Sequence, residues 1–110
     1  KVTSTIKVGK WPYYATHNKN KNLLLVTNQR DDSITVIDMK KKETIITLDE
    51  ICEYPEGIDI SYSQKLIVVA CWFQDNIILI DLDSFKIKKK IETSGGPRAF
   101  GRFILKKKYD

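Results

Sequence analysis

The chain of 110 residues has only one histidine and two cysteines, which is too few for common metal chemistry. A tetrahedral zinc set cannot be completed from them, and Cys52 and Cys71 lack the C-x-x-C spacing of a redox motif. A glycine-rich phosphate loop and a nucleophile elbow are also missing. We therefore predict no metal site and no cofactor, and we assign no catalytic residue in this segment.

Long apolar runs are absent as well. The longest are Leu23–Val26 and Leu66–Cys71, which have the length of strands, whereas a membrane helix needs about 18 or more apolar residues. We expect no membrane span in this segment. The chain begins at Lys1 rather than at methionine, so we expect further residues upstream, including any signal peptide or lipid anchor.

The positive charge lacks the pattern of a nucleic-acid site. A net charge of +5 and a pI near 9.2 arise mainly from the lysine runs 40–42, 88–90 and 106–108. Surfaces that bind nucleic acids usually place aromatic side chains or arginines between their lysines, and these runs contain neither. We interpret them as solvated edges and predict no nucleic-acid partner.

The strongest feature that is present is an internal repeat. A shift of 43 positions aligns residues 12–48 with residues 55–91 without a gap. Apolar positions coincide in this alignment, as in Val36 with Leu79, and a third copy begins at residue 95. The identical pairs are Pro12/Pro55, Leu23/Leu66, Val26/Val69, Asp32/Asp75, Ile34/Ile77, Ile37/Ile80 and Asp38/Asp81.

Each repeat unit has the pattern of short strands separated by polar turns. The second strand is apolar on both faces, as expected for a strand packed between two sheets. The predicted strands are 13–18, 23–28, 33–38 and 43–48 in the first unit, and 57–62, 66–71, 76–81 and 86–91 in the second.

Four short antiparallel strands in about 43 residues are typical of a β-propeller blade. The sequence therefore predicts an all-β fold, a β-propeller fragment made of four-stranded antiparallel blades. The fourth strand should form the outer edge of each blade. In the second unit Lys86 and Lys88–Lys90 would protect this edge from pairing with another chain.

Two motifs of the first unit resemble the YVTN-type β-propeller repeat. Leu25-Val26-Thr27-Asn28 resembles the Tyr-Val-Thr-Asn motif, and 32–38 resembles the alternating strand that ends in Val-Ile-Asp. The second unit carries weaker versions at 68–71 and 75–81. The family's Gly-x-x-Pro-x-Gly motif appears at 9–14, 53–57 and 95–99, whereas its Pro-Asp-Gly hairpin is replaced at 18–22 and 61–65.

The resemblance implies the C-terminal blades of a ring that is typically seven-bladed, in an exported bacterial protein of the periplasm or cell surface. We expect two complete blades plus flanking strands, with the rest of the last blade supplied by an N-terminal portion of the protein. The expected divisions are 1–8 as the last strand of a preceding blade, 9–51 as the first complete blade, 52–94 as the second, 95–104 as the first strand of a further blade, and 105–110 as a charged C-terminal tail.

One end of each blade should carry the connections between its second and third strands and those between successive units. This loop face holds the aromatic residues that do not fit a core pattern, with arginines beside them, as in an interface hot spot. Alternatively, Trp11 and Tyr54, which each precede a proline, fill gaps between blades. The binding candidates are Trp11, Tyr13, Arg30, Tyr54, Trp72, Phe73 and Arg98, with Trp72 and Phe73 expected to be the most exposed.

Two further predictions concern the channel and the cysteines. His17 falls on the innermost strand and aligns with Arg102, so both are candidates for lining the central channel. Cys52 and Cys71 fall on connections at the loop face. A disulfide between them and two free buried thiols both fit the sequence.

The sequence favours a non-catalytic binding or scaffolding module that contacts a protein partner through its loop face. Its partners would include the remaining blades of its own ring. The alternative is a fragment of a propeller enzyme that resembles a quinoprotein amine dehydrogenase, a haem-binding nitrite reductase or a lactonase. Catalytic residues of such an enzyme would then lie on other blades, because propellers host unrelated activities on one scaffold.

Overall fold

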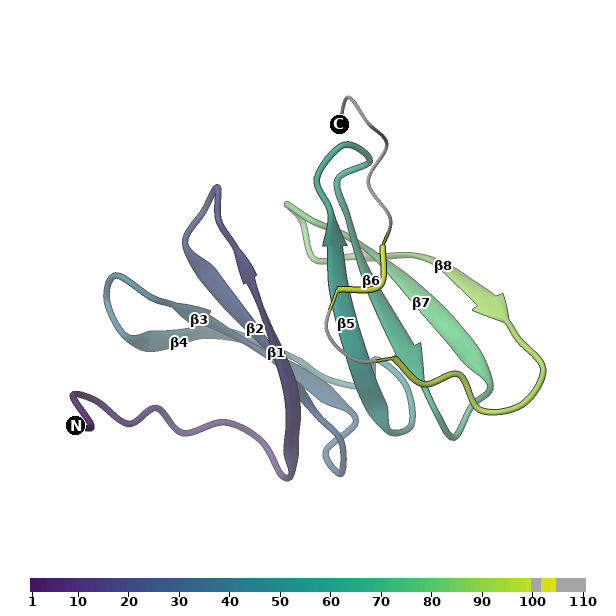
Figure 1. Ribbon diagram of the computed structural model, residues 1–110, viewed down its shortest axis with the longest axis horizontal. Helices are drawn as coiled ribbons and strands as arrows, with labels where there is room; N and C mark the ends of the chain where they lie inside the picture. Colours follow the sequence, from purple (N-terminus) through teal and green to yellow (C-terminus); the bar gives the residue numbers. More distant parts are fainter. Residues whose placement is uncertain (100–101, 105–110) are drawn as a thin grey trace.

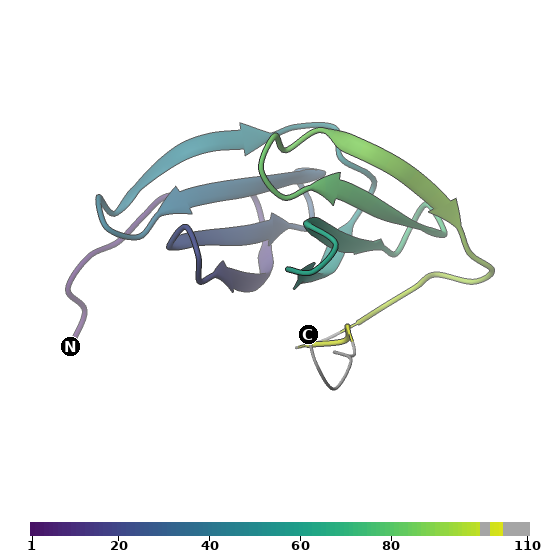
Figure 2. The same cartoon turned by 90° about the horizontal axis from the view of Figure 1, so that it is seen from above.

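The computed structural model describes residues 1–99 and 102–104, which form eight β-strands and no helix. The strands build two antiparallel sheets in the orders β1-β2-β3-β4 and β5-β6-β7-β8, which lie side by side (Figures 1 and 2). No helix that could cross a membrane occurs in this part of the chain. The strands are β1 (Pro12–Asn18), β2 (Leu23–Asn28), β3 (Ser33–Asp38), β4 (Glu43–Leu48), β5 (Pro55–Ser61), β6 (Leu66–Cys71), β7 (Asn76–Asp81) and β8 (Ile87–Glu92).

The prediction of an all-β fold with four-stranded antiparallel sheets is confirmed, and every predicted strand lies within two residues of the observed one. The first sheet lies within residues 9–51 and the second within 52–94. The division of the chain at residue 52 stays a prediction.

The repeat extends to the backbone of the turns. Residues with a left-handed φ recur 43 positions apart, although such a φ is uncommon outside glycine. Hydrogen bonds recur in the same way: Asp38 caps the amides two and three residues later, and Asp81 does the same. The amides of Ser84 and Asp83 lower the pKa of Asp81. The left-handed pairs are Trp11/Tyr54, Asn22/Lys65, Asp32/Asp75 and Lys42/Phe85.

One apolar core spans both sheets. Leu25, Ile34 and Val36 of the first sheet have no exposed surface, and they belong to one cluster with residues such as Ile67 and Ile78 of the second. The innermost strands β1 and β5 are also in contact with each other. Burial of apolar surface stabilises the pair by roughly 25 cal/mol per Å², so each sheet supports its neighbour.

Polar bonds fix how the second sheet sits on the first. The Asp32 carboxylate, in the β2–β3 turn, accepts a hydrogen bond from the Tyr54 amide at 3.2 Å. The Thr27 hydroxyl donates to the Glu56 carbonyl at 2.8 Å. At the opposite end of the junction the Tyr62 hydroxyl donates to the His17 carbonyl at 3.1 Å. The two sheets are therefore tied at both ends of their innermost strands.

The outer edges of the two sheets differ. β8 presents Lys88, Lys89 and Lys90, all exposed, which agrees with an edge blunted by charge. At the equivalent positions of β4, Ile45 and Ile46 are 47% and 41% exposed. Protection by lysine is therefore a property of the second sheet only.

The segments that flank the two sheets were predicted to be strands of further blades. Residues 1–8 contain no strand, and neither do 95–99 or 102–104. A strand needs a hydrogen-bonded neighbouring strand. In the described residues the two sheets contain only β1–β4 and β5–β8, so no strand pairs with either flanking segment. The strand assignment of these segments stays a prediction for a ring that contains further blades. The tail predicted at 105–110 lies outside the described residues.

Candidate functional site

Three aromatic side chains gather on the loop face of the second sheet. Tyr54 packs edge-on against Phe73, with ring centroids 4.7 Å apart, and against Trp72 at 5.8 Å. The Trp72 and Phe73 rings lie 5.1 Å apart. We call Tyr54, Trp72 and Phe73 the aromatic cluster. Phe73 is 58% exposed, so the cluster offers an ordered apolar surface to the solvent.

Arg98 extends this surface. Its guanidinium lies 4.9 Å from the Trp72 ring centroid, and two of its nitrogens bond the Glu56 carboxylate at 2.8 and 3.2 Å. The hydrogen bond to Glu56, with another to Tyr13, raises the pKa of the Arg98 guanidinium. Glu56 is fully buried, and it also accepts a hydrogen bond from the Gln29 side chain. An ion pair with a buried carboxylate therefore holds the Arg98 guanidinium over the Trp72 ring.

Trp11 and Arg30 form a separate pair on the first sheet. The Arg30 guanidinium stacks 4.0 Å from the Trp11 ring, and Trp11 is 60% exposed. These positions are 43 residues before Tyr54 and Phe73, so the two contacts are equivalent in the two repeat units. The first sheet has Gln29 at the position of Trp72. Only the second sheet therefore carries the three-ring cluster.

The seven predicted binding residues thus fall into two groups on one face. Arg98 joins the aromatic cluster, and Tyr13 on β1 reaches the same group through Arg98. Trp11 and Arg30 stand apart as the equivalent pair of the first sheet. Tyr54 is half-buried and its amide is bonded to Asp32, which matches the alternative that it fills the junction between sheets. Phe73 is exposed, as expected, but the expectation that Trp72 is among the most exposed residues is wrong, because its ring packs against Tyr54 and Phe73 and is half-buried. Trp11 is exposed, so it does not fill a gap between the two sheets.

A groove of about 500 Å³ opens on the loop face beside the junction of the sheets. Its lining holds five carboxylates and Lys90, which concentrates negative potential on a chain of net charge +5. No metal-binding group of three or more histidine, cysteine, aspartate or glutamate side chains occurs in the described residues. The sequence did not reveal this groove, because its acids lie on two connections that are far apart in the chain. The carboxylates are Asp31, Asp32, Asp49, Glu50 and Glu53.

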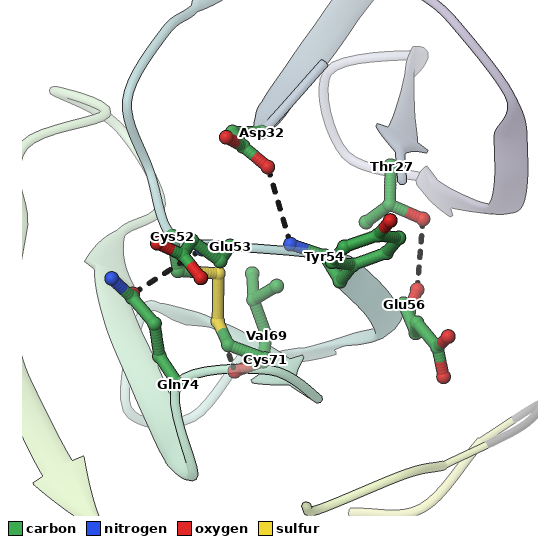
Figure 3. Close-up of a disulfide and its surroundings, with 9 residues drawn as sticks. All are labelled: Thr27, Asp32, Cys52, Glu53, Tyr54, Glu56, Val69, Cys71 and Gln74. Carbon is green, nitrogen blue, oxygen red and sulfur yellow. Dashed lines mark hydrogen bonds between the residues drawn. A yellow bond between two sulfur atoms is a disulfide. The ribbon is translucent and has the colours of Figure 1, made fainter. Parts of the chain in front are cut away.

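A disulfide joins Cys52 to Cys71, with an S–S distance of 2.02 Å and a Cα–Cα distance of 6.0 Å (Figure 3). Both cysteines are buried. The bridge attaches the connection between the two sheets to the end of β6. It lies two residues before Tyr54 and one before Trp72, so it fixes the backbone on both sides of the aromatic cluster.

The disulfide replaces a polar network of the first sheet. The positions equivalent to Cys52 and Cys71 are Gly9 and Asn28, and a Cβ added to Gly9 would lie 2.9 Å from the Asn28 Cβ. The Asn28 amide instead donates to the hydroxyls of Ser33 and Thr35, at 3.1 and 2.8 Å. The two units therefore close the same corner, one by hydrogen bonds and the other by a covalent bond.

The two channel candidates have different surroundings. His17 is exposed on β1, and its Nε2 lies 2.8 Å from the Asn22 side-chain oxygen. Arg102 forms an ion pair with Asp59 at 2.6 Å. Asp59 is fully buried and also accepts hydrogen bonds from the amides of Phe103 and Ile104. The structure does not bring His17 and Arg102 together, and their role in a channel stays a prediction.

The buried acids Glu56 and Asp59 are functional candidates that the sequence alone did not indicate. Both lie on the innermost strand β5, and each pairs with an arginine of the segment that follows β8. A buried carboxylate is costly unless it is paired. The signal in the sequence is a spacing of 42 or 43 residues between acid and arginine, equal to one repeat unit.

The architecture and these junctions define the chain as a fragment of a β-propeller, and solved structures with the same arrangement support this class. The chain is similar to hydrazine synthase of Kuenenia stuttgartiensis, with 31% identity and a TM-score of 0.78, covering 89% of this chain and 28% of that one. The apo form of AztD from Citrobacter koseri gives 20% identity and a TM-score of 0.73 over 84% and 27%. The β-propeller domain of Cps50 (Swd1) from Myceliophteria thermophila gives 16% and 0.70 over 86% and 29%.

The chain thus spans less than a third of the length of these proteins. No protein-family model matches it, and no curated protein matches it significantly. The β-propeller prediction is confirmed by the structural similarity, and each sheet is henceforth called a blade. The YVTN-type assignment stays a prediction.

The disulfide predicts a specific result with thiol reagents. Iodoacetamide should label no cysteine in the unfolded, non-reduced protein and two cysteines after reduction. Because the bridge closes a loop with a separation of 19 residues, reduction should lower the free energy of unfolding by about 3 kcal/mol.

The matched variant C52G/C71N carries the residues of the first blade at both positions. Its urea midpoint should not change on addition of reductant, whereas that of the parent protein should fall. Two reactive thiols in the non-reduced protein would contradict the bridge.

Proposed function

We propose that the chain is part of a non-catalytic propeller module that binds or scaffolds a protein partner through its loop face. The observation that carries this proposal is the aromatic cluster of Tyr54, Trp72 and Phe73. It is ordered by ring contacts on one side and by Arg98 on the other, yet Phe73 is 58% exposed. A large apolar side chain in this state is typical of an interface anchor.

The rigidity of the cluster supports this function. Arg98 is fixed by two bonds to a buried carboxylate, and the disulfide fixes the backbone next to Tyr54 and Trp72. Little side-chain freedom then remains to be lost when a partner binds, and that loss is a main cost of association. The aromatic cluster is therefore preorganised for binding a partner.

The proposed compartment follows from the cysteines. A disulfide buried in a small domain persists in oxidising compartments and is rare in the cytosol. This supports an exported bacterial protein of the periplasm or cell surface. The YVTN-type motif and a ring of about seven blades belong to the same proposal.

Site-specific photo-crosslinking tests the partner surface. We expect benzoylphenylalanine at position 73 of the full-length protein, expressed in its own host, to yield a crosslinked protein band. The substitution Trp72→Ala in the same background should reduce that band, because the side chain at position 73 then loses a neighbouring ring that orders it. The yield at position 73 measures the contact directly.

Position 89 on the lysine edge of β8 is the matched control. A crosslinker there should give no such band, and the substitutions K88E and K89E should leave the band at position 73 unchanged. Crosslinks from position 89 but none from position 73 would contradict the proposal.

A second candidate is a blade pair of an enzyme whose catalytic residues lie elsewhere. The identity of 31% with a chain of hydrazine synthase favours it, because the other two similarities are far lower. This candidate and the binding module make opposite predictions for the absorption spectrum. The purified full-length protein should show no visible band of haem or quinone if it is the binding module, and such a band would favour the enzyme.

A further inference from the structure

The disulfide and the groove on the loop face share one residue. Cys52 lines the groove and is 5% exposed, whereas Cys71 has no exposed surface. A reagent in solution therefore reaches the bridge from the groove, at the sulfur of Cys52. With a volume of about 500 Å³, the groove has the size of a small-molecule site. We call it the acidic groove.

The charged residues around Cys52 are specific to its connection. Acids stand on both sides of this cysteine, whereas the equivalent connection before the first blade carries lysines and has Gly9 in place of the cysteine. The acids and the cysteine therefore occur in the same connection and are absent from the earlier one. The acids are Asp49, Glu50 and Glu53, and the residues 43 positions earlier are Ile6, Lys7 and Lys10.

The charge of the acidic groove discriminates between thiols. The species that attacks a disulfide is the thiolate, which is itself negative. Five carboxylates and one lysine line the groove, and a surface of this kind repels anions and attracts cations. A thiolate that also carries an ammonium group has no net charge, so it is not repelled. A thiolate that also carries a carboxylate is doubly negative, so it is repelled most.

We propose that Cys52 is a selective site of thiol–disulfide exchange, which thiols with an amino group reach through the acidic groove. Thiols with a carboxylate are kept out by the same charges. The disulfide is thus protected against anionic reductants and open to aminothiols. This site is separate from the proposed binding of a partner, because it requires nothing of the aromatic cluster.

The exchange proceeds in two steps. The first thiolate forms a bond to the Cys52 sulfur while the S–S bond breaks, and the electron pair leaves with the Cys71 sulfur. A second thiolate attacks the small thiol in this mixed disulfide and releases Cys52, so two small thiols are oxidised to their disulfide. Each cysteine then takes up one of the two protons that the thiols lost. The Val69 carbonyl oxygen, 3.9 Å from the Cys71 sulfur, lies ready to accept the hydrogen of that thiol (Figure 3).

Reduction by three small thiols tests the selectivity. Cysteamine, 2-mercaptoethanol and 3-mercaptopropionate have thiolates that are uncharged overall, singly negative and doubly negative. Each rate of reduction of the oxidised chain is divided by the rate of the same thiol with 2-hydroxyethyl disulfide, which is neutral, to remove differences in intrinsic reactivity. At an ionic strength of about 0.01 M, we expect the normalised rate of cysteamine to exceed that of 3-mercaptopropionate at least about tenfold.

Matched variants locate the charges responsible. D49N/E53Q removes two exposed charges of the groove and should reduce the rate ratio about threefold. E43Q/D83N removes the same charge from the opposite end of the blades and should leave the ratio unchanged. Lys90→Glu adds negative charge to the groove and should increase the ratio.

The parent chain supplies two measurements that need no variant. The Debye length falls from about 30 Å at 0.01 M salt to about 3 Å at 1 M, so the rate ratio should approach one in 1 M salt. Acid quenching early in the reduction, followed by peptide mapping, identifies the attacked sulfur. We expect the small thiol on Cys52 and a free thiol at Cys71.

Three outcomes would overturn the proposal. Equal normalised rates for the three thiols at low salt would show that the bridge reacts only after the chain unfolds, when the groove no longer exists. Equal rate ratios for D49N/E53Q and E43Q/D83N would show that the groove does not control access. A mixed disulfide on Cys71 would show that the bridge is reached from another side.

Discussion

In each blade, a carboxylate in the turn between the second and third strands accepts a hydrogen bond from the backbone segment that follows the fourth strand. Asp32 binds the Tyr54 amide, and Asp75 binds the Gly96 amide. Both aspartates have a left-handed φ, so the turn directs the side chain across the junction. The position of Tyr54, and with it the aromatic cluster and the groove, depends on this bond. The apolar core supplies most of the stability of the junction, and the hydrogen bond to the carboxylate fixes where the next segment lies.

The repeat supplies the scaffold, and departures from the repeat supply the candidate functions. Backbone φ values, turn bonds and apolar faces recur 43 residues apart. The side chains that distinguish the blades gather on one face: Trp72 replaces Gln29, Phe73 replaces Arg30, and a disulfide replaces Gly9 and Asn28. A surface that only joined blades would not need these differences. This contrast is the physical reason for proposing that a partner binds at the second blade.

The strands and their order could be predicted from the sequence, because each strand occurs in two copies 43 residues apart and both copies must fit the same apolar pattern. The ion pairs of Glu56 and Asp59 could not, since each arginine lies one repeat unit away and the segment that carries it is not a strand. Sequence spacing also left the state of Cys52 and Cys71 open, because it places their connections on one face but does not fix a distance. Strands at 1–8 and 95–104 were predicted from alignment alone, without the neighbours that a ladder requires.

The most direct test of this account is the free energy of unfolding of the variant Asp32→Asn, measured with urea beside Asp31→Asn. Asparagine tolerates the left-handed backbone at position 32, so the substitution removes the charge and keeps the shape. The account predicts that Asp32→Asn loses about 1 kcal/mol and quenches or shifts the fluorescence of Trp72 next to Tyr54. Asp31→Asn, whose carboxylate lies exposed in the same turn, should change neither. Equal effects of the two substitutions, or none from either, would contradict the claim that this carboxylate positions the site.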